Sequence, residues 1–257
     1  MTAVMEDPLI AGMTIRRLLP LHESSRRLRD LCPECPRVYG VAVMSDVSRR
    51  RWWPLQAALT TDRLERMSAS AAEELGNPAA ATHQLAAVLA HAVLGRVVAL
   101  VVLEGRAWDT GLENLWVHVD SEGTIDWLGV VDPTLRVLPD DPCRNAQGAE
   151  GTVELPGEAA LTTWIAHRCH RSLTPLFSRL SRAGGGAVSV ASMWHTVGSA
   201  VVVTATRVPM LAGAGESVGM RRDQAVLDAL AGFGLPVRGQ FPTRRQGLAK
   251  LGQPSLS

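Results

Sequence analysis

Two apolar segments separated by glycines decide the fold of this chain: 164-WIAHRCHRSLTPL-176 and 190-VASMWHTVGSAV-201. Residues 182–186 between them read RAGGG, and glycine favours the turn that lets two helices fold back on each other. In the first segment apolar residues recur at intervals of three and four, which predicts a helix with one buried face. That face consists of Leu161, Trp164, Ile165, Cys169 and Leu173. His167 and His170 are left on the opposite side, where they are available for chemistry.

The second segment is apolar almost all the way round, and Gly198 allows close packing. This pattern predicts a buried helix with His195 in the core. A buried imidazole needs a partner, which is a hydrogen-bond acceptor, a metal ion or a haem iron. His167 or His170 would supply a second imidazole. The walls that a porphyrin needs would come from Trp164, Phe177, Met193 and Trp194. The simpler interpretation is that His195 bonds a buried carbonyl and the other two histidines are solvated.

Three features follow one another in this region: a helix that ends in His-x-x-Leu-x-Pro-Leu at residues 170–176, a glycine-rich break, and a helix that opens on Trp194. Together they resemble the ferric-siderophore reductase family, in its actinobacterial FhuF-like form. The resemblance covers the chain from about Trp52 onward and implies one-electron reduction of a bound ferric chelate. Family members end in an adjacent cysteine pair and a Cys-x-x-Cys, usually just after Arg-Arg, which hold a 2Fe–2S cluster. Here no cysteine follows Arg244 and Arg245, so that cluster is not expected. Trp194 is followed by a histidine instead of the family's usual Gly-Asn.

Cysteines elsewhere are the first alternative source of metal ligands. Cys32 and Cys35 form a Cys-x-x-Cys on a proline-containing turn, a spacing that lets two thiolates reach one metal ion. Adding Cys143 and Cys169 would give four thiolates, which suit zinc or an iron–sulfur cluster. Cys169, however, also falls on the apolar face of its helix, where a free cysteine acts as a small hydrophobic residue. The sequence therefore predicts metal ligands at Cys32, Cys35 and His195.

Arginines downstream of the second helix suggest a ligand pocket, since guanidinium groups bind carboxylates in bidentate fashion. These arginines are Arg207, Arg221, Arg222, Arg244 and Arg245. The candidate catalytic residues are then His195 and His170, and the candidate cofactor-binding residues are His167, Trp194 and Arg207. Phosphate-binding loops, zinc-protease and serine-hydrolase motifs are missing from the sequence.

Three functions stay open. The first is an iron-dependent redox protein, with iron as haem, an iron–sulfur cluster or a mononuclear ion. The second is a repurposed biosynthetic enzyme that uses haem or non-haem iron bound through His195. The third is a non-catalytic protein that binds a siderophore-like small molecule, such as a ferric chelate.

The fold class follows from a mixture of helical and strand patterns. Residues 115–120 and 124–129 alternate around a Ser-Glu-Gly turn and predict a β-hairpin, while Ala- and Val-rich residues from Pro78 to about Leu103 predict a central buried helix. We expect an α+β, mostly helical protein with a hairpin-containing part at 1–140 and a helical part at 152–257. The alternative is that the two parts form one continuous domain.

The bulk composition is that of an ordinary globular protein. The 257 residues are 46% hydrophobic and 20% charged, with a net charge of +1 and dispersed arginines, so we expect no nucleic-acid partner. The N-terminal residues lack the pattern of a secretory signal, and His91 and Arg96 interrupt the longest apolar run, so we expect no membrane span and a cytoplasmic location.

Overall fold

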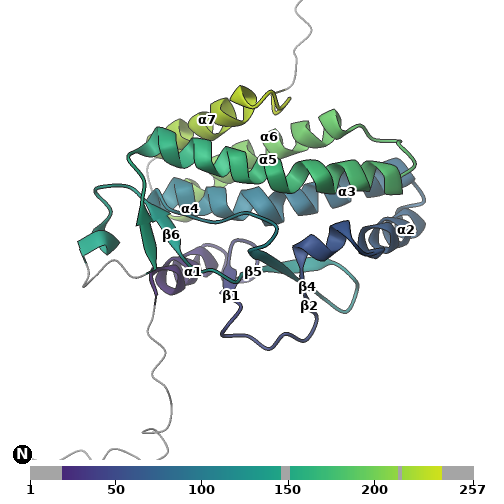
Figure 1. Ribbon diagram of the computed structural model, residues 1–257, viewed down its shortest axis with the longest axis horizontal. Coiled ribbons are helices and arrows are strands. Elements are labelled where there is room, and N and C mark those ends of the chain that lie inside the picture. The colour runs from purple at the N-terminus through teal and green to yellow at the C-terminus, as the bar shows by residue number, and fades with distance from the viewer. Residues whose placement is uncertain (1–18, 146–150, 214–215, 239–257) are drawn as a thin grey trace, which may run out of the picture.

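The computed structural model describes residues 19–145, 151–213 and 216–238 and has an α+β, mostly helical fold, as predicted. A layer of helices lies over a small mixed sheet (Figure 1). The helices are α1 (Pro20–Asp30), α2 (Arg63–Leu75), α3 (Pro78–Ala90), α4 (Arg96–Glu104), α5 (Glu158–Ala183), α6 (Val190–Leu211) and α7 (Glu216–Gly232), with 3₁₀ turns η1 (Leu55–Leu59) and η3 (Pro142–Asn145).

The strands form two sheets. The first has the order β1-β5-β4-β2 and consists of β1 (Val41–Val43), β2 (Trp52–Pro54), β4 (Leu115–Val119) and β5 (Ile125–Val130). In it β1 pairs with β5 in parallel, while β4 pairs with β5 and β2 antiparallel. The second sheet has the order β3-β6-β7 and consists of β3 (Ala107–Trp108), β6 (Leu135–Val137) and β7 (Thr152–Glu154).

The predicted β-hairpin is confirmed as β4 and β5. Leu115 and Val117 face the core with no exposed surface, while Trp116 and His118 point to the other side of the sheet. The pairing slips between His118 and Val119, which forms a β-bulge close to the hairpin turn. The hairpin therefore has one apolar face against the helices and one aromatic face turned away from them.

The central helix is built from α3, η2 (His91–Gly95) and α4, which follow one another without a break. Asn77 starts it, because its side-chain oxygen accepts hydrogen bonds from the backbone N–H groups of Ala79 and Ala80 at 3.0 and 3.1 Å. The η2 segment has π-helical hydrogen bonding. A Cβ on Gly95 would lie 2.7 Å from Nδ1 of His91, so the glycine makes room for the imidazole.

Buried arginines tie the helices to the loops. Arg96, only 3% exposed, donates to the carbonyl oxygens of Arg37, Gly40 and Asp126, and thereby fastens the loop before β1 and strand β5 to α4. Burial lowers the pKa of Arg96 to about 10, which still leaves it charged at neutral pH. These bonds offset much of the cost of removing the guanidinium from water.

A second buried arginine joins α1 to the segment after β6. Arg106 binds both oxygens of Asp141 at 2.6 and 3.0 Å and Oε2 of Glu104 at 2.8 Å. Ser24 of α1 also donates to Glu104, at 2.6 Å. All of these groups are nearly inaccessible to solvent, so loss of one hydrogen-bond partner would leave the others buried and unsatisfied and would destabilise the folded state.

The long helices α5 and α6 form the predicted helical pair, joined at Gly185 and Gly186, which have φ angles of 66° and 77°. One cluster of buried side chains extends from Leu21 to Val237 and includes residues of both predicted parts of the chain. The prediction that α6 is buried all round is wrong. Met193, Trp194, Val197 and Val201 are buried, but Val203 and Met210 on the other side are 58% and 66% exposed.

Candidate functional site

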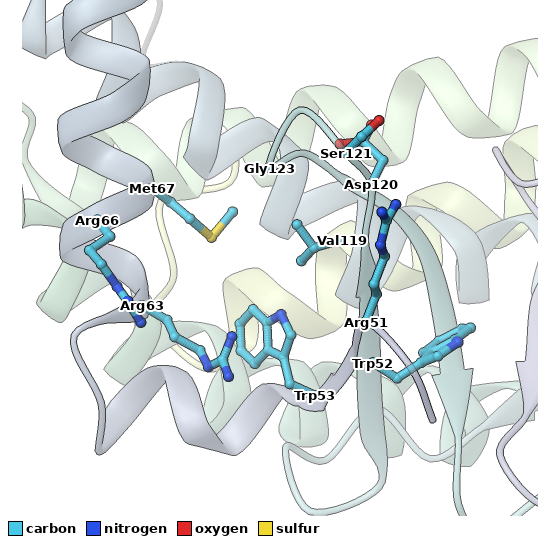
Figure 2. A pocket seen from close by; sticks show the side chains of 10 residues that line it. All are labelled: Arg51, Trp52, Trp53, Arg63, Arg66, Met67, Val119, Asp120, Ser121 and Gly123. Atoms are coloured by element: carbon cyan, nitrogen blue, oxygen red, sulfur yellow. The ribbon is translucent and has the colours of Figure 1, made fainter. Parts of the chain in front are cut away.

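A cleft of about 570 Å³ lies between the first turns of α2, the edge strand β2 and the turn of the β4–β5 hairpin (Figure 2). Three arginines, two tryptophans and a methionine contribute most of its lining. The lining residues are Arg51, Trp52, Trp53, Arg63, Arg66, Met67, Val119, Asp120, Ser121 and Gly123. They come from three segments that are far apart in the sequence.

Helix α2 provides Arg63, Arg66 and Met67, and an arginine from α5 holds its start in place. Arg179 donates from Nε to Oε1 of Glu65 at 2.8 Å, from Nη2 to the carbonyl oxygen of Thr61 at 2.6 Å, and from Nη1 to the carbonyl oxygen of Leu59. The hydrogen bond from Arg179 lowers the pKa of Glu65. The position of the cleft's cationic wall is therefore fixed by the helical layer.

The second wall is the turn before β2, where Arg51 has a φ of 64°. It is the one non-glycine residue with a positive φ in the described part of the chain. Its carbonyl oxygen accepts a hydrogen bond from the N–H of Val119 at 3.1 Å, which fixes the turn to the edge of β4. The left-handed conformation is costly for a residue with a side chain, and such strain is found more often at functional sites than elsewhere.

The floor of the cleft is apolar and its rim is positive. The guanidinium of Arg63 lies 5.0 Å from the ring centre of Trp53, a cation–π contact, and Arg66 pairs with Asp62 at 3.1 Å. Among the described residues, neither Arg51 nor Arg63 has a carboxylate partner. Asp120 also lines the cleft, but its Oδ1 accepts the backbone N–H groups of Glu122 and Thr124 at 2.9 Å. Two cations are thus left for a ligand.

Trp52 lies at the edge of the cleft and also packs on the aromatic face of the sheet (Figure 2). Its ring centre is 5.4 Å from that of His118 and 6.2 Å from that of Trp127. His118 Nδ1 bonds Oδ1 of Asp126 at 2.6 Å, and Arg37 bonds the other carboxylate oxygen. Burial alone would raise the pKa of Asp126, but the bonds from His118 and Arg37 outweigh it and lower the pKa. This face holds a histidine whose orientation is fixed by a carboxylate.

The histidines predicted to bind iron do not form a group of three metal ligands among the described residues. His195 is exposed on α6, so the prediction that it is buried is wrong. His167 is exposed and His170 half-buried, and both ring centres lie 5.9 Å from that of Phe233, which the sequence did not single out. His170 also lies 6.4 Å from Trp194.

The side chains predicted to wall a porphyrin are mostly core residues. Met193 and Phe177 have no exposed surface and Trp194 is 2% exposed; the rings of Phe177 and Trp194 pack edge to face at 5.5 Å. Trp164 is half-buried beneath the guanidinium of Arg136 at 4.6 Å. Phe177, Met193 and Trp194 therefore contribute to the core of the protein.

The four cysteines are free thiols in different surroundings. Cys32 is half-buried and Cys35 exposed, in a turn closed by a 2.9 Å hydrogen bond from Cys35 N–H to the carbonyl oxygen of Cys32. Cys169 is fully buried, its Sγ lies 3.3 Å from Oγ1 of Thr110, and burial raises its pKa to about 12. Cys143 is half-buried beside the Arg106 network, and burial raises its pKa.

Metal ligands do not cluster in the described residues: no group of three or more His, Cys, Asp or Glu side chains there could hold an ion. The predicted set of four thiols is therefore not gathered into one group, and Cys169 lies in the core beside Thr110. The turn at Cys32 and Cys35 therefore offers two thiols without a third protein ligand from the described residues.

The arginines predicted to form an anion pocket are mostly engaged elsewhere. Arg221 and Arg222 each lie 3.3 Å from Glu158, and Arg222 also donates to the carbonyl oxygens of Val101 and Val102 at the end of α4. Arg207 is exposed on α6; burial raises the pKa of nearby Tyr39, and the charge of Arg207 opposes that rise. Arg244 and Arg245 lie outside the described residues.

One helix in the described part of the chain, Pro78–Glu104, is long and apolar enough to cross a membrane. Within the protein 83% of its most apolar window is buried, as is usual for the core helix of a globular fold. Comparisons with protein-family models, with curated proteins and with solved structures find no match. The relation to the ferric-siderophore reductases therefore remains a prediction from sequence motifs.

Proposed function

We propose that this protein binds a small anionic ligand with an apolar or aromatic body in the cleft between α2 and β2. The observation that carries the proposal is the pair Arg51 and Arg63, which face a cleft floored by Trp53 without carboxylate partners among the described residues. Small-molecule sites typically combine apolar walls with a few placed charges, and arginine suits carboxylates and phosphates in particular.

The cleft has the physical properties that such binding requires. Trp53 is 5% exposed and Met67 half-buried, so a ligand would cover apolar surface, while the exposed rim would leave its charged group in contact with Arg51 and Arg63. The hydrogen bond from Val119 to Arg51 fixes the backbone of the turn, so the side chain of Arg51 starts from a defined position before any ligand arrives. Preorganisation of this kind reduces the entropy lost on binding.

Calorimetric titration of the whole chain with acetate, benzoate and hexanoate would test the proposal. Affinity should increase with the size of the apolar body and decrease as salt shortens the Debye length from about 30 Å to about 8 Å between 0.01 and 0.15 M. Arg63→Met keeps an apolar cover over Trp53 but removes the charge, and should weaken binding about tenfold, equivalent to about 1.4 kcal/mol. Arg50→Met, in the same turn region but outside the lining, is the matched control. Equal affinities in both variants would refute the proposal.

Redox chemistry at iron is the second candidate, supported by the resemblance to ferric-siderophore reductases and by the free thiols of Cys32 and Cys35. In this proposal the protein is cytoplasmic, where thiols stay reduced, and a ferric chelate is the anionic ligand of the cleft. Visible spectroscopy with metal analysis of the purified protein tests it. Iron bound in wild type and lost in a Cys32→Ser/Cys35→Ser variant would support this function, while a colourless, iron-free protein would exclude it.

A further inference from the structure

A second hollow of about 230 Å³ adjoins the cleft and shares Arg66, Met67 and Gly123 with it. Its floor is apolar and comes from three elements, α2, α3 and β5. The floor residues are Ala71, Leu85, Val88 and Ile125. The two hollows together form a groove that follows helix α2 past the turn of the β4–β5 hairpin.

One face of α2 lines the whole groove. Arg63, Arg66 and Met67 line the cleft, and Ala71 and Glu74 line the second hollow, at intervals of three to four residues that keep side chains on one side of a helix. Residues 63 to 74 span roughly 16 Å at about 1.5 Å per residue. An elongated ligand could therefore contact both ends at once.

The charge of the groove changes sign along its length. Arg51 and Arg63 stand at one end, while Glu74 and Glu122 line the other. Two further charged residues line the groove: Asp120 at the first end, whose Oδ1 accepts backbone N–H groups, and Arg66, which pairs with Asp62. Within the described ranges neither Glu74 nor Glu122 has a basic partner. Unpaired cations and unpaired carboxylates separated by apolar surface are complementary to a molecule with a negative end, an apolar or weakly polar middle and a positive end.

A buried donor between the two ends indicates what the middle should contain. Nε1 of Trp53 is buried without a hydrogen-bond acceptor in a side chain that is 5% exposed. Figure 2 shows the indole nitrogen on the ring edge that faces Met67 and Val119, inside the cleft. A buried N–H without a partner is costly, and a carbonyl group of a bound ligand would satisfy it once the side chains that cover the nitrogen move aside.

We propose that the groove binds a linear zwitterion of the peptide type, with its carboxylate at Arg51 and Arg63 and its ammonium group at Glu74 and Glu122. An extended chain covers about 3.3–3.6 Å per residue, so a span of roughly 16 Å corresponds to about four to five residues. A backbone carbonyl accepts the hydrogen bond from Trp53 Nε1. This inference rests on the anion-binding function of the cleft and adds the second charge and the length.

The test is calorimetric titration of the whole chain with penta-alanine, its N-acetylated form and its C-terminal amide. Penta-alanine should bind best, and each blocked form should bind about tenfold more weakly. In a Glu74→Gln/Glu122→Gln variant the free and N-acetylated peptides should bind equally, because the variant no longer recognises the ammonium group. Glu73→Gln, on the same helix but outside the lining, should behave as wild type. Di-alanine should bind more weakly than penta-alanine because it cannot span the groove.

The outcomes separate this inference from the function on which it rests. If benzoate binds in an Arg63-dependent manner but N-acetylation of the peptide changes nothing, or no peptide binds, the zwitterion proposal is wrong and the anion site stands. If neither benzoate nor any peptide binds, both are wrong. The inference would also be overturned if the Glu73→Gln control bound the free and the N-acetylated peptides equally, since that result would place the ammonium group elsewhere.

Discussion

Replacing Arg51 by glycine removes both the backbone strain of the turn and the charge of the side chain. The free energy of unfolding reports the loss of strain, and the affinity for an anion reports the loss of charge. At a φ of 64° a residue with a side chain is held in the left-handed region, at a cost of about 1–2 kcal/mol that glycine does not incur. Glycine also makes the unfolded chain more flexible, which destabilises by roughly 0.5–1 kcal/mol. The two effects oppose each other, so Arg51→Gly should leave stability unchanged or raise it by up to about 1 kcal/mol.

Arg50→Gly is the matched control for this substitution. Arg50 is adjacent, and its φ is not positive, because Arg51 is the one non-glycine residue with that property in the described part of the chain. Both variants add the same flexibility to the unfolded chain and remove one charge. The difference between their free energies of unfolding therefore isolates the strain, and should be about 1–2 kcal/mol in favour of Arg51→Gly.

Urea unfolding followed by tryptophan fluorescence measures this difference, and titration with benzoate measures the accompanying loss of affinity. Arg51→Gly should bind about tenfold more weakly than wild type, while Arg50→Gly should bind equally well. An Arg51→Gly variant as unstable as Arg50→Gly would show that the turn stores no strain. An Arg51→Gly variant with unchanged affinity would show that this arginine does not contact the ligand.

Three further substitutions test other parts of the structure. Burial lowers the pKa of His91 to about 4, so the unfolded state, with a histidine pKa of about 6.5, takes up its proton first as the pH falls. Stability should then decrease by up to about 3 kcal/mol from pH 6.5 to 4, and urea unfolding of His91→Gln should show a smaller decrease. Arg106→Met leaves Asp141 buried without its cation and leaves Glu104 with Arg27 alone, and should cost about 3–5 kcal/mol, measured by urea unfolding at neutral pH. His195→Ala removes an exposed side chain and should change the unfolding free energy by less than about 0.5 kcal/mol and leave the visible spectrum of the protein unaltered.

Local patterns in the sequence predicted the hairpin and the central helix. The hairpin of β4 and β5 followed from alternation around a turn, and the helix that begins with α3 followed from its Ala- and Val-rich composition. The orientation of α6 could not be predicted in the same way. Its exposed side carries Val202, Val203 and Met210, so its composition matches that of a core helix, and only the packing of α3, α4, α5 and α7 shows which side is covered.

The candidate site depended on contacts between distant parts of the chain. Arg51, Arg63 and Gly123 belong to a turn, a helix and a hairpin, and no spacing rule relates them. A local signal was nevertheless present, because three arginines directly precede Trp52 and Trp53 in the sequence. Arginine binds anions and stacks on tryptophan, so a run of both residue types is a local indication of a cationic and aromatic surface.

The π-helical turn at η2 lets the central helix carry one residue more than a regular α-helix would use over the same rise. Deleting one residue between His91 and Gly95 would therefore restore regular hydrogen bonding and leave α4 in nearly the same orientation relative to α3. A deletion inside α3 or α4, where no extra residue exists, would instead rotate one end of the helix by about 100° relative to the other. Arg96 would then swing away from its three carbonyl acceptors, and apolar side chains of α4 would turn toward water. Single-residue deletions should therefore be tolerated better at η2 than elsewhere in the central helix.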